Sequence, residues 1–295
     1  MFDLSIQDRF IEAGGHRLKT RTLGKIDPSK PTLVFMHEGL GSIGLWKDFP
    51  EQVAQAVEMP VLMYDRWGHG DSDKLIGDRK PSYRHVESLE IMPEVLRQFD
   101  LGDVIFVGHS DGGCMSLLYS SQHPNNVLGI VGLAPQVGTP ARSPQEQEQK
   151  QKEKEKEKEK EKEKEKQSKT AGSTMQLVMD HFENGGLKEK LARYHGDNTE
   201  TMFYGWANAW GSKEFAGWNM RKELKDLKCP VHVIVGDNDP YGYQHNIDEL
   251  KNESTASVSV SIEPNAGHVP HLEAREFTLQ HTVAAINSFP KIEQN

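Results

Sequence analysis

The chain alternates short runs of apolar, β-forming residues with longer amphipathic stretches, and this alternation constrains the fold more than any other feature. Such a pattern is typical of strands joined by crossover helices. Because the apolar runs are almost continuous, both faces of each strand should be covered, as they are in a mostly parallel sheet. The expected class is therefore α/β, with helices on both faces of the sheet and an opening hairpin around Gly14 and Gly15.

The expected elements follow one another regularly along most of the chain. We expect buried strands at residues 32–36, 61–64, 104–107, 128–133, 231–235 and 257–262. We expect helices at residues 45–57, 83–99, 112–121, 246–251 and 276–289.

One long interruption separates the fourth of these strands from the fifth. Residues 137–219 contain no strand-like segment and have the pattern of helices. We expect an all-helical cap here, inserted into a core made of residues 1–136 and 220–295. The last part of the interruption is rich in aromatic residues, among them Trp206 and Trp210. These rings either pack the cap onto the core or line an apolar pocket, where both tryptophans would bind substrate.

The start of the expected cap carries a strict alternation of Lys and Glu at residues 152–166. Residues three apart have opposite charge, but residues four apart have like charge, so helical charge pairing is partly cancelled. With no apolar residue from Gln145 to Lys166, no face of this tract can pack. The tract should be solvated, and either a fraying helix or a disordered segment fits it.

Composition argues against several classes of protein. The net charge is −9 and no Lys/Arg cluster is free of acidic residues, which disfavours nucleic acid as a partner. The longest strongly apolar stretch, residues 127–134, is far shorter than the roughly 20 residues of a membrane span. Cys114 and Cys229 lie in no pattern of metal-ligand spacing. We expect a soluble, cytoplasmic protein without secretory signal, metal or cofactor, acting on a small molecule, and we leave a homo-oligomer open.

The most informative segment is residues 104–113, where a strand runs through Gly-x-Ser-x-Gly into a helix. A serine on so tight a turn is forced into strained backbone angles, and its neighbours two positions away must be small, as Gly108 and Gly112 are. The turn presents the hydroxyl of Ser110 clear of the sheet. It also directs the backbone N–H of Asp111 toward an oxyanion formed beside that hydroxyl.

With this motif the sequence resembles the α/β-hydrolase superfamily, and more closely its capped serine hydrolases of the carboxylesterase and meta-cleavage-product hydrolase group. The resemblance implies a nucleophile, an acid and a histidine in that chain order. On this basis Ser110, Asp239 and His268 are the expected catalytic triad, with Asp237 and His271 as fallback choices. His268 would take the proton of Ser110, and Asp239 would orient and stabilise the imidazole.

The same resemblance places a second oxyanion donor in the turn after the first long strand. This chain has His37-Glu38-Gly39-Leu40 there, with a glutamate where the family usually has glycine. The expected donor is the N–H of Gly39, or alternatively that of Leu40. The segment at residues 65–72 resembles the family's Asp-x-Arg-Gly-x-Gly-x-Ser loop. We assign it a structural role.

Two carboxylates, those of Glu38 and Asp111, therefore flank the expected nucleophile. Either both point to solvent or to local backbone, or one of them binds a cationic group of the substrate such as an α-amine. Glu38 and Leu40 are accordingly candidate substrate-binding residues.

The expected activity is that of a carboxylesterase-like enzyme. Ser110 would attack an ester, amide or related acyl group of a small molecule and form an acyl-enzyme. The resemblance leaves open a carbon–carbon bond hydrolase or lyase that uses the same triad. It also leaves open a non-catalytic small-molecule binding protein. Relatives that attack with aspartate, the haloalkane dehalogenases and epoxide hydrolases, do not fit a serine at this position.

Overall fold

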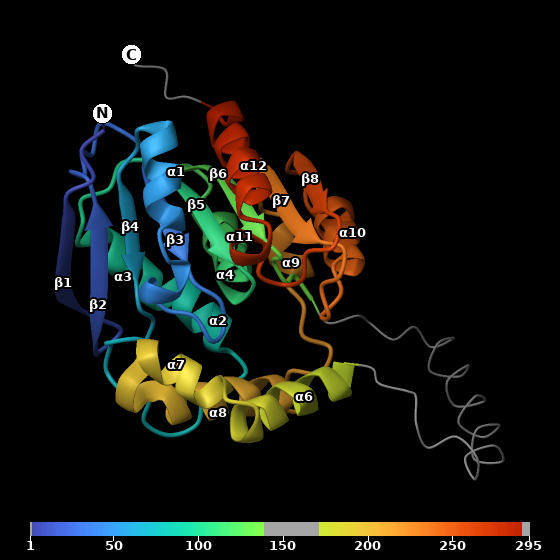
Figure 1. Ribbon diagram of the computed structural model, residues 1–295. Helices are drawn as coiled ribbons and strands as arrows, with labels where there is room; N and C mark the ends of the chain where they lie inside the picture. The colour runs from blue at the N-terminus through green and yellow to red at the C-terminus, as the bar shows by residue number, and fades with distance from the viewer. Residues whose placement is uncertain (1, 139–170, 291–295) are drawn as a thin grey trace, which may run out of the picture.

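A computed structural model describes residues 2–138 and 171–290 of the chain. Its centre is an eight-stranded sheet in the order β1-β2-β4-β3-β5-β6-β7-β8 (Figure 1). The strands are β1 (Ile6–Ala13), β2 (His16–Leu23), β3 (Thr32–Met36), β4 (Val61–Tyr64), β5 (Val104–His109), β6 (Val127–Leu133), β7 (Val231–Gly236) and β8 (Val258–Glu263). From β4 to β8 all neighbours pair in parallel, whereas β2 is antiparallel to both β1 and β4. The mostly parallel α/β sheet expected from the sequence is confirmed.

Helices flank this sheet on both faces. The elements after β3 are η1 (Ile43–Trp46) and α1 (Phe49–Val57), and those after β4 are α2 (Tyr83–Val86), η2 (Glu87–Ile91) and α3 (Met92–Arg97). The remaining core helices are α4 (Asp111–Gln122), α9 (Arg221–Leu224), α10 (Gln244–Glu253), α11 (Pro270–Glu273) and α12 (Arg275–Ser288). The middle segment η2 is a π-helical turn, and it ends next to Pro93, whose missing N–H cannot continue a regular ladder.

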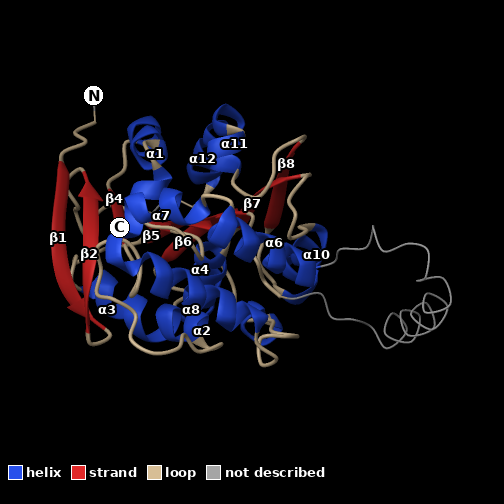
Figure 2. Cartoon of the chain, turned by 60° about the horizontal axis from the view of Figure 1, so that its bottom comes forward, coloured by secondary structure: helices blue, strands red, loops and turns tan. Residues whose placement is uncertain are grey.

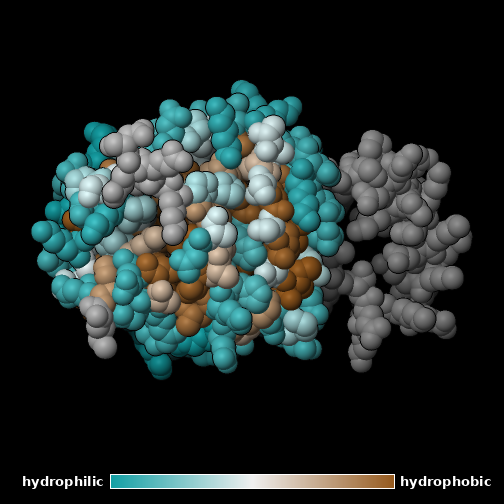
Figure 3. All heavy atoms as spheres, turned by 90° about the horizontal axis from the view of Figure 1, so that it is seen from above, coloured by the Kyte–Doolittle hydropathy of each residue, from teal (hydrophilic) through white to brown (hydrophobic). Residues whose placement is uncertain are grey.

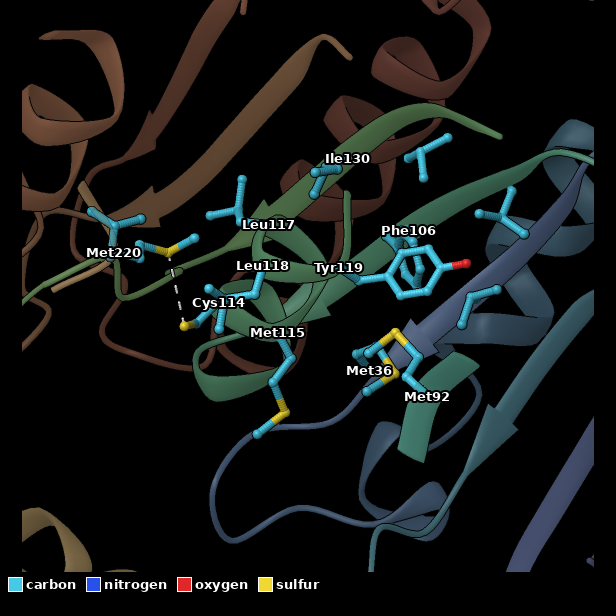
Figure 4. Close-up of a cluster of buried hydrophobic side chains, with 14 of the residues drawn as sticks. Met36, Met92, Phe106, Cys114, Met115, Leu117, Leu118, Tyr119, Ile130 and Met220 are labelled. Carbon is cyan, nitrogen blue, oxygen red and sulfur yellow. Dashed lines mark hydrogen bonds between the residues drawn. The ribbon is translucent and has the colours of Figure 1, made fainter. Parts of the chain in front are cut away.

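Alternate side chains of the central strands enter two separate cores. In β3, Leu33 and Phe35 pack with α1 and α12 on one face, while Val34 and Met36 pack with α3 and α4 on the other. Figure 4 shows part of the second cluster, with Met36 from the sheet beside residues of α4. A strand that is apolar on both faces reads as a continuous apolar run, which explains why the sequence pattern identified these strands.

Three helices lie apart from both of these layers: α6 (Ala171–Asn184), α7 (Leu187–His195) and α8 (Thr199–Gly211). They lie across one end of the sheet, at the bottom of Figure 1, and that end comes forward in Figure 2. The chain leaves the sheet after β6 and returns before α9 at one point. There Gly138 and Asn219 form an antiparallel bridge, and the N–H of Met220 donates to the carbonyl of Val137 at 3.1 Å.

Figure 3 shows the opposite end of the molecule. Seen from that side, hydrophobic residues gather toward the middle of the face and hydrophilic residues surround them (Figure 3). The Lys/Glu tract at residues 152–166 lies outside the described residues.

Candidate active site

Ser110 lies on the turn that joins β5 to α4, at the end of the sheet covered by α6 to α8. Its backbone has φ 50° and ψ −112°, in the left-handed half of conformational space that residues with a Cβ rarely adopt. Glycines on either side make the turn possible. A Cβ on Gly112 would collide with the carbonyl of Met36, and a Cβ on Gly108 would lie 2.6 Å from the carbonyl oxygen of Gly112. The strained serine expected from the sequence is thus present.

The loops after β7 and β8 bring an aspartate and a histidine to this serine. The hydroxyl of Ser110 lies 3.0 Å from Nε2 of His268, and Nδ1 of His268 lies 2.7 Å from Oδ2 of Asp239. The second carboxylate oxygen of Asp239 accepts the N–H of Tyr241 at 2.9 Å. The Asp239 side chain is 2% exposed, whereas that of His268 is 15% exposed and can meet a ligand.

The fallback residues lie elsewhere. Asp237 accepts the N–H of Asn265 at 2.6 Å. The imidazole of His271 is buried and packs on the rings of Trp46 and Phe49. Neither contact leads to Ser110, so the structure assembles the expected set and not its alternatives.

Two further residues hold the backbone around His268. Nε2 of His109, the residue before the serine, donates to the carbonyl oxygen of His268 at 2.7 Å. The carboxylate of Glu273 accepts the N–H groups of Gly267 and Val269, on either side of the histidine. The imidazole is therefore fixed through its own carbonyl and through both neighbouring peptides.

The turn after β3 lies beside Ser110 and contains the expected oxyanion donor. The N–H of Leu40 already donates to Oε2 of Glu38 at 2.8 Å. Within the described residues, the N–H of Gly39 has no hydrogen-bond partner, and neither has that of Asp111 at the first position of α4. Gly39 and Asp111 therefore keep the free donors that an oxyanion requires, and Leu40 does not.

Buried side chains fix this turn through three consecutive carbonyls. Arg66 Nη2 donates to Glu38 at 2.6 Å, His69 Nε2 to Gly39 at 3.0 Å, and His195 Nε2 to Leu40 at 3.0 Å. Arg66 and His69 come from the loop at residues 65–72, which gives that loop a specific structural role. His195 comes from the end of α7, and no sequence signal indicated it.

The carboxylate of Asp111 does not face the solvent. It forms a buried ion pair with Arg84, whose Nε lies 3.0 Å from Oδ1, and it accepts the hydroxyl of Tyr83. The Tyr83 hydroxyl in turn accepts the indole N–H of Trp210 at 3.1 Å. Burial acts to raise the pKa of Asp111, but the charges of Arg84 and Arg66 and the hydrogen bonds from Tyr83 and Arg84 together outweigh it, and the pKa is lowered. The expected roles for this carboxylate, a group that faces solvent or binds local backbone or else a cation site, are therefore wrong, because the side chains of Arg84 and Tyr83 already bind it.

The carboxylate of Glu38, unlike that of Asp111, forms no ion pair among the described residues. One oxygen is bound by the local N–H of Leu40, as in the first of the two alternatives, while the side chain also lines a pocket. Burial raises the pKa of Glu38, and the hydrogen bond from Leu40 opposes the rise. The positive charge of an ionised His268 would also lower it.

A pocket opens on Ser110 and contains about 310 Å³ of empty space, its open mouth included. Its lining residues are Glu38, Gly39, Leu40, Ser110, Gln136, Trp206, Trp210, Tyr241 and His268. Sequence reasoning missed Gln136 and Tyr241. Both lie in loops that follow strands at the carboxyl edge of the sheet, Gln136 after β6 and Tyr241 after β7. Ligands of open α/β sheets bind at this edge, and that position could have indicated them.

Among residues 2–138 and 171–290, no group of three or more histidine, cysteine, aspartate or glutamate side chains is arranged to hold a metal ion. The helices in these ranges include none with the length and apolarity to cross a bilayer.

Fold and site geometry together define an α/β hydrolase-type protein. The sequence model of the alpha/beta hydrolase fold family matches residues 31–275, and the chain belongs to this family. Proline iminopeptidase from Lactobacillus delbrueckii subsp. lactis is 25% identical over 129 residues, which is 43% of this chain and 44% of that protein. The alignment thus spans less than half of the curated relative.

Solved structures share the fold over almost the whole chain. The structure of VinJ is 20% identical and has a TM-score of 0.65, with 96% of this chain and 99% of that chain covered. The 2-hydroxy-6-oxo-6-phenylhexa-2,4-dienoate hydrolase from Rhodococcus sp. strain RHA1 is 15% identical and has a TM-score of 0.69, with the same coverage. At these identities the likeness shows the fold alone.

Proposed function

We propose that the protein is a serine hydrolase that cleaves an ester, amide or related acyl bond of a small molecule. The observation that carries the proposal is the continuous path from Ser110 through His268 to Asp239, with contacts of 3.0 and 2.7 Å. Nucleophile, base and orienting acid at hydrogen-bond distance are what nucleophilic acyl transfer requires. The likeness to a proline iminopeptidase also favours acyl chemistry.

In the proposed reaction, Oγ of Ser110 attacks the substrate carbonyl while Nε2 of His268 takes the hydroxyl proton. Asp239 stabilises the resulting imidazolium through Nδ1–H. The negative charge on the former carbonyl oxygen is bound by the N–H groups of Gly39 and Asp111. The intermediate then expels the leaving group, which receives the proton from His268, and a water molecule activated by the same imidazole releases the acid.

We assign residues 137–219, of which the structure describes 137–138 and 171–219, the role of a cap over this site. Support comes from α8, which contributes Trp206 and Trp210 to the pocket lining. A cap that closes over the serine excludes bulk water and strengthens the electrostatic interactions inside.

The test compares wild type with Ser110→Ala on short p-nitrophenyl esters and with a fluorophosphonate probe. We expect the wild type to be labelled and to turn over, and both signals to vanish in the variant, since losing a triad nucleophile lowers kcat by about a millionfold. A wild type that neither labels nor hydrolyses would overturn the proposal in favour of a binding protein. Labelling without ester turnover would instead favour carbon–carbon bond hydrolysis by the same serine.

A further inference from the structure

Glu38 places a carboxylate directly before Gly39, the proposed oxyanion donor. Oε2 of Glu38 is bound to the N–H of Leu40, and within the described residues Oε1 has no hydrogen-bond partner. The side chain lines the pocket beside Ser110 and His268. One carboxylate oxygen is therefore available to a ligand that enters the pocket.

The pocket contains no fixed positive charge to balance this carboxylate. Glu38 is the one acidic residue among those that line it, and none of them is lysine or arginine. The neighbouring carboxylate of Asp111 forms a buried ion pair with Arg84, so the positive charge of Arg84 is already balanced by Asp111. Glu38 is therefore the acidic side chain that a ligand in the pocket meets, and the nearby guanidinium of Arg66 binds its backbone carbonyl and not its carboxylate.

That charge opposes formation of the oxyanion, although the imidazolium that forms on His268 in the same step attracts both anions. Attack by Ser110 creates an oxyanion at the N–H of Gly39, one residue from Glu38, and two negative charges in a poorly solvated pocket repel each other strongly. Burial raises the pKa of Glu38, and the hydrogen bond from the N–H of Leu40 opposes the rise without supplying a positive charge. A positive charge on the substrate would remove the conflict.

The aromatic walls of the pocket suit such a charge. The rings of Trp206 and Trp210 have centroids 6.0 Å apart, and those of Trp210 and Tyr241 are 6.5 Å apart. The indole of Trp206 packs on Gly39 so closely that a Cβ there would collide with it. Aromatic faces next to a carboxylate form a favourable environment for an ammonium group.

We infer that the substrate of the proposed serine hydrolase carries a positively charged group close to its scissile carbonyl, such as a protonated primary amine, and that the carboxylate of Glu38 binds it. This inference rests on the proposed function and names its substrate class. The small volume of the pocket favours a short acyl group, such as that of an amino-acid ester or amide.

The experiment uses the p-nitrophenyl esters of alanine and isobutyric acid, which differ only in an ammonium group against a methyl group. Each is assayed at a pH below the pKa of the amine and corrected for spontaneous hydrolysis. We expect wild type to prefer the alanine ester. Glu38→Gln keeps an acceptor for the N–H of Leu40 but loses the charge. It should lower kcat/KM for the alanine ester at least about tenfold and raise that for the isobutyrate ester.

A matched control is Glu214→Gln, which removes an exposed carboxylate from the segment after α8. It should not change the preference between the two esters. The inference is overturned if Glu38→Gln lowers both rates in parallel, or if wild type prefers the isobutyrate ester.

Failure of the inference is distinguished from failure of the proposed function by two readouts. Labelling of wild type and Glu38→Gln by a neutral fluorophosphonate reports on Ser110 alone. Calorimetric binding of alaninamide and isobutyramide to Ser110→Ala reports on cation recognition without turnover. Preferential binding of alaninamide that is lost in Ser110→Ala/Glu38→Gln supports the inference even if no ester is hydrolysed, and equal binding of the two amides overturns it.

Discussion

The imidazole of His195 donates a 3.0 Å hydrogen bond to the carbonyl oxygen of Leu40, while its other nitrogen accepts the N–H of Gly70 at 2.9 Å. One side chain at the end of α7 thus connects the helical insertion to the turn that carries the proposed oxyanion donor. Both contacts require a neutral ring with the proton on Nε2. Burial lowers the pKa of His195 to about 4, which keeps the ring in that form at neutral pH.

Replacing His195 with alanine should therefore lower kcat more than it affects KM. The N–H of Gly39 would lose its fixed orientation. Complete loss of an oxyanion donor lowers kcat by about a hundred- to a thousandfold, and this sets the upper limit of the expected effect. Asn198→Ala is the matched control, because Asn198 binds the carbonyls of Gly70 and Ser72 but not the oxyanion turn. Steady-state kinetics on a p-nitrophenyl ester measure kcat and KM of both variants. An equal fall of kcat in the two would show that His195 only holds α7 against the core and does not position the oxyanion donor.

Asp239→Asn should lower kcat by about a thousandfold or more while the protein stays folded. The amide cannot accept the Nδ1–H of His268 and also stabilise the imidazolium. Asp237→Asn in the same loop should change kcat little, since within the described residues its side chain accepts only the N–H of Asn265, which an amide oxygen also accepts. Comparable losses in the two variants would contradict the assignment of Asp239.

Asp111→Asn should destabilise the fold. It leaves the guanidinium of Arg84 buried without a counter-charge, and breaking one side of a buried pair costs about 3 to 5 kcal/mol. Urea unfolding measures the loss, and adding Arg84→Met should recover part of it, because no unpaired charge then remains. Glu200→Gln, in the exposed pair with Lys188, is the control and should shift the unfolding midpoint little. Equal shifts of the unfolding midpoint for Asp111→Asn and Glu200→Gln would show that the buried pair contributes no more to stability than the exposed one.

His271→Phe should make stability less dependent on pH. Burial lowers the pKa of His271 from 6.5 to about 3. Between these two pH values the imidazole binds a proton in the unfolded chain but stays neutral in the folded protein. The contribution of this histidine is present above pH 6.5 and is lost as the pH falls toward its folded pKa. Between pH 6.5 and about pH 5 the variant should lose about 2 kcal/mol less than wild type. Urea midpoints across this range test it, and His181→Phe on the surface should follow wild type.

The fold and the proposed triad were largely predictable because their signals are local. Strand β3 is apolar on both faces, and Gly108 and Gly112 enclose the serine within five residues of sequence. The expected helix at residues 45–57 was wrong at its start, because Lys47 has φ 57° and separates η1 from α1. The choice between Asp237 and Asp239 stayed open in the sequence, since only the folded loop shows which one faces the histidine.

The support of the oxyanion turn could not be predicted. Its partners Arg66, His69 and His195 are between 28 and 155 residues away from the carbonyls they bind. The pairing of Asp111 with Arg84 spans 27 residues, and without it the carboxylate resembled a free anion beside the nucleophile. Such contacts depend on which segments the topology brings together, and no sequence period encodes them.

The bridge between Gly138 and Asn219 affects how the sequence of this protein can diverge in evolution. Since the chain departs from and rejoins the sheet at neighbouring positions, residues gained or lost between them do not alter the spacing of β6 and β7. The strands that hold the proposed triad and the proposed cap can therefore diverge at separate rates, as long as the contact of His195 with Leu40 is kept.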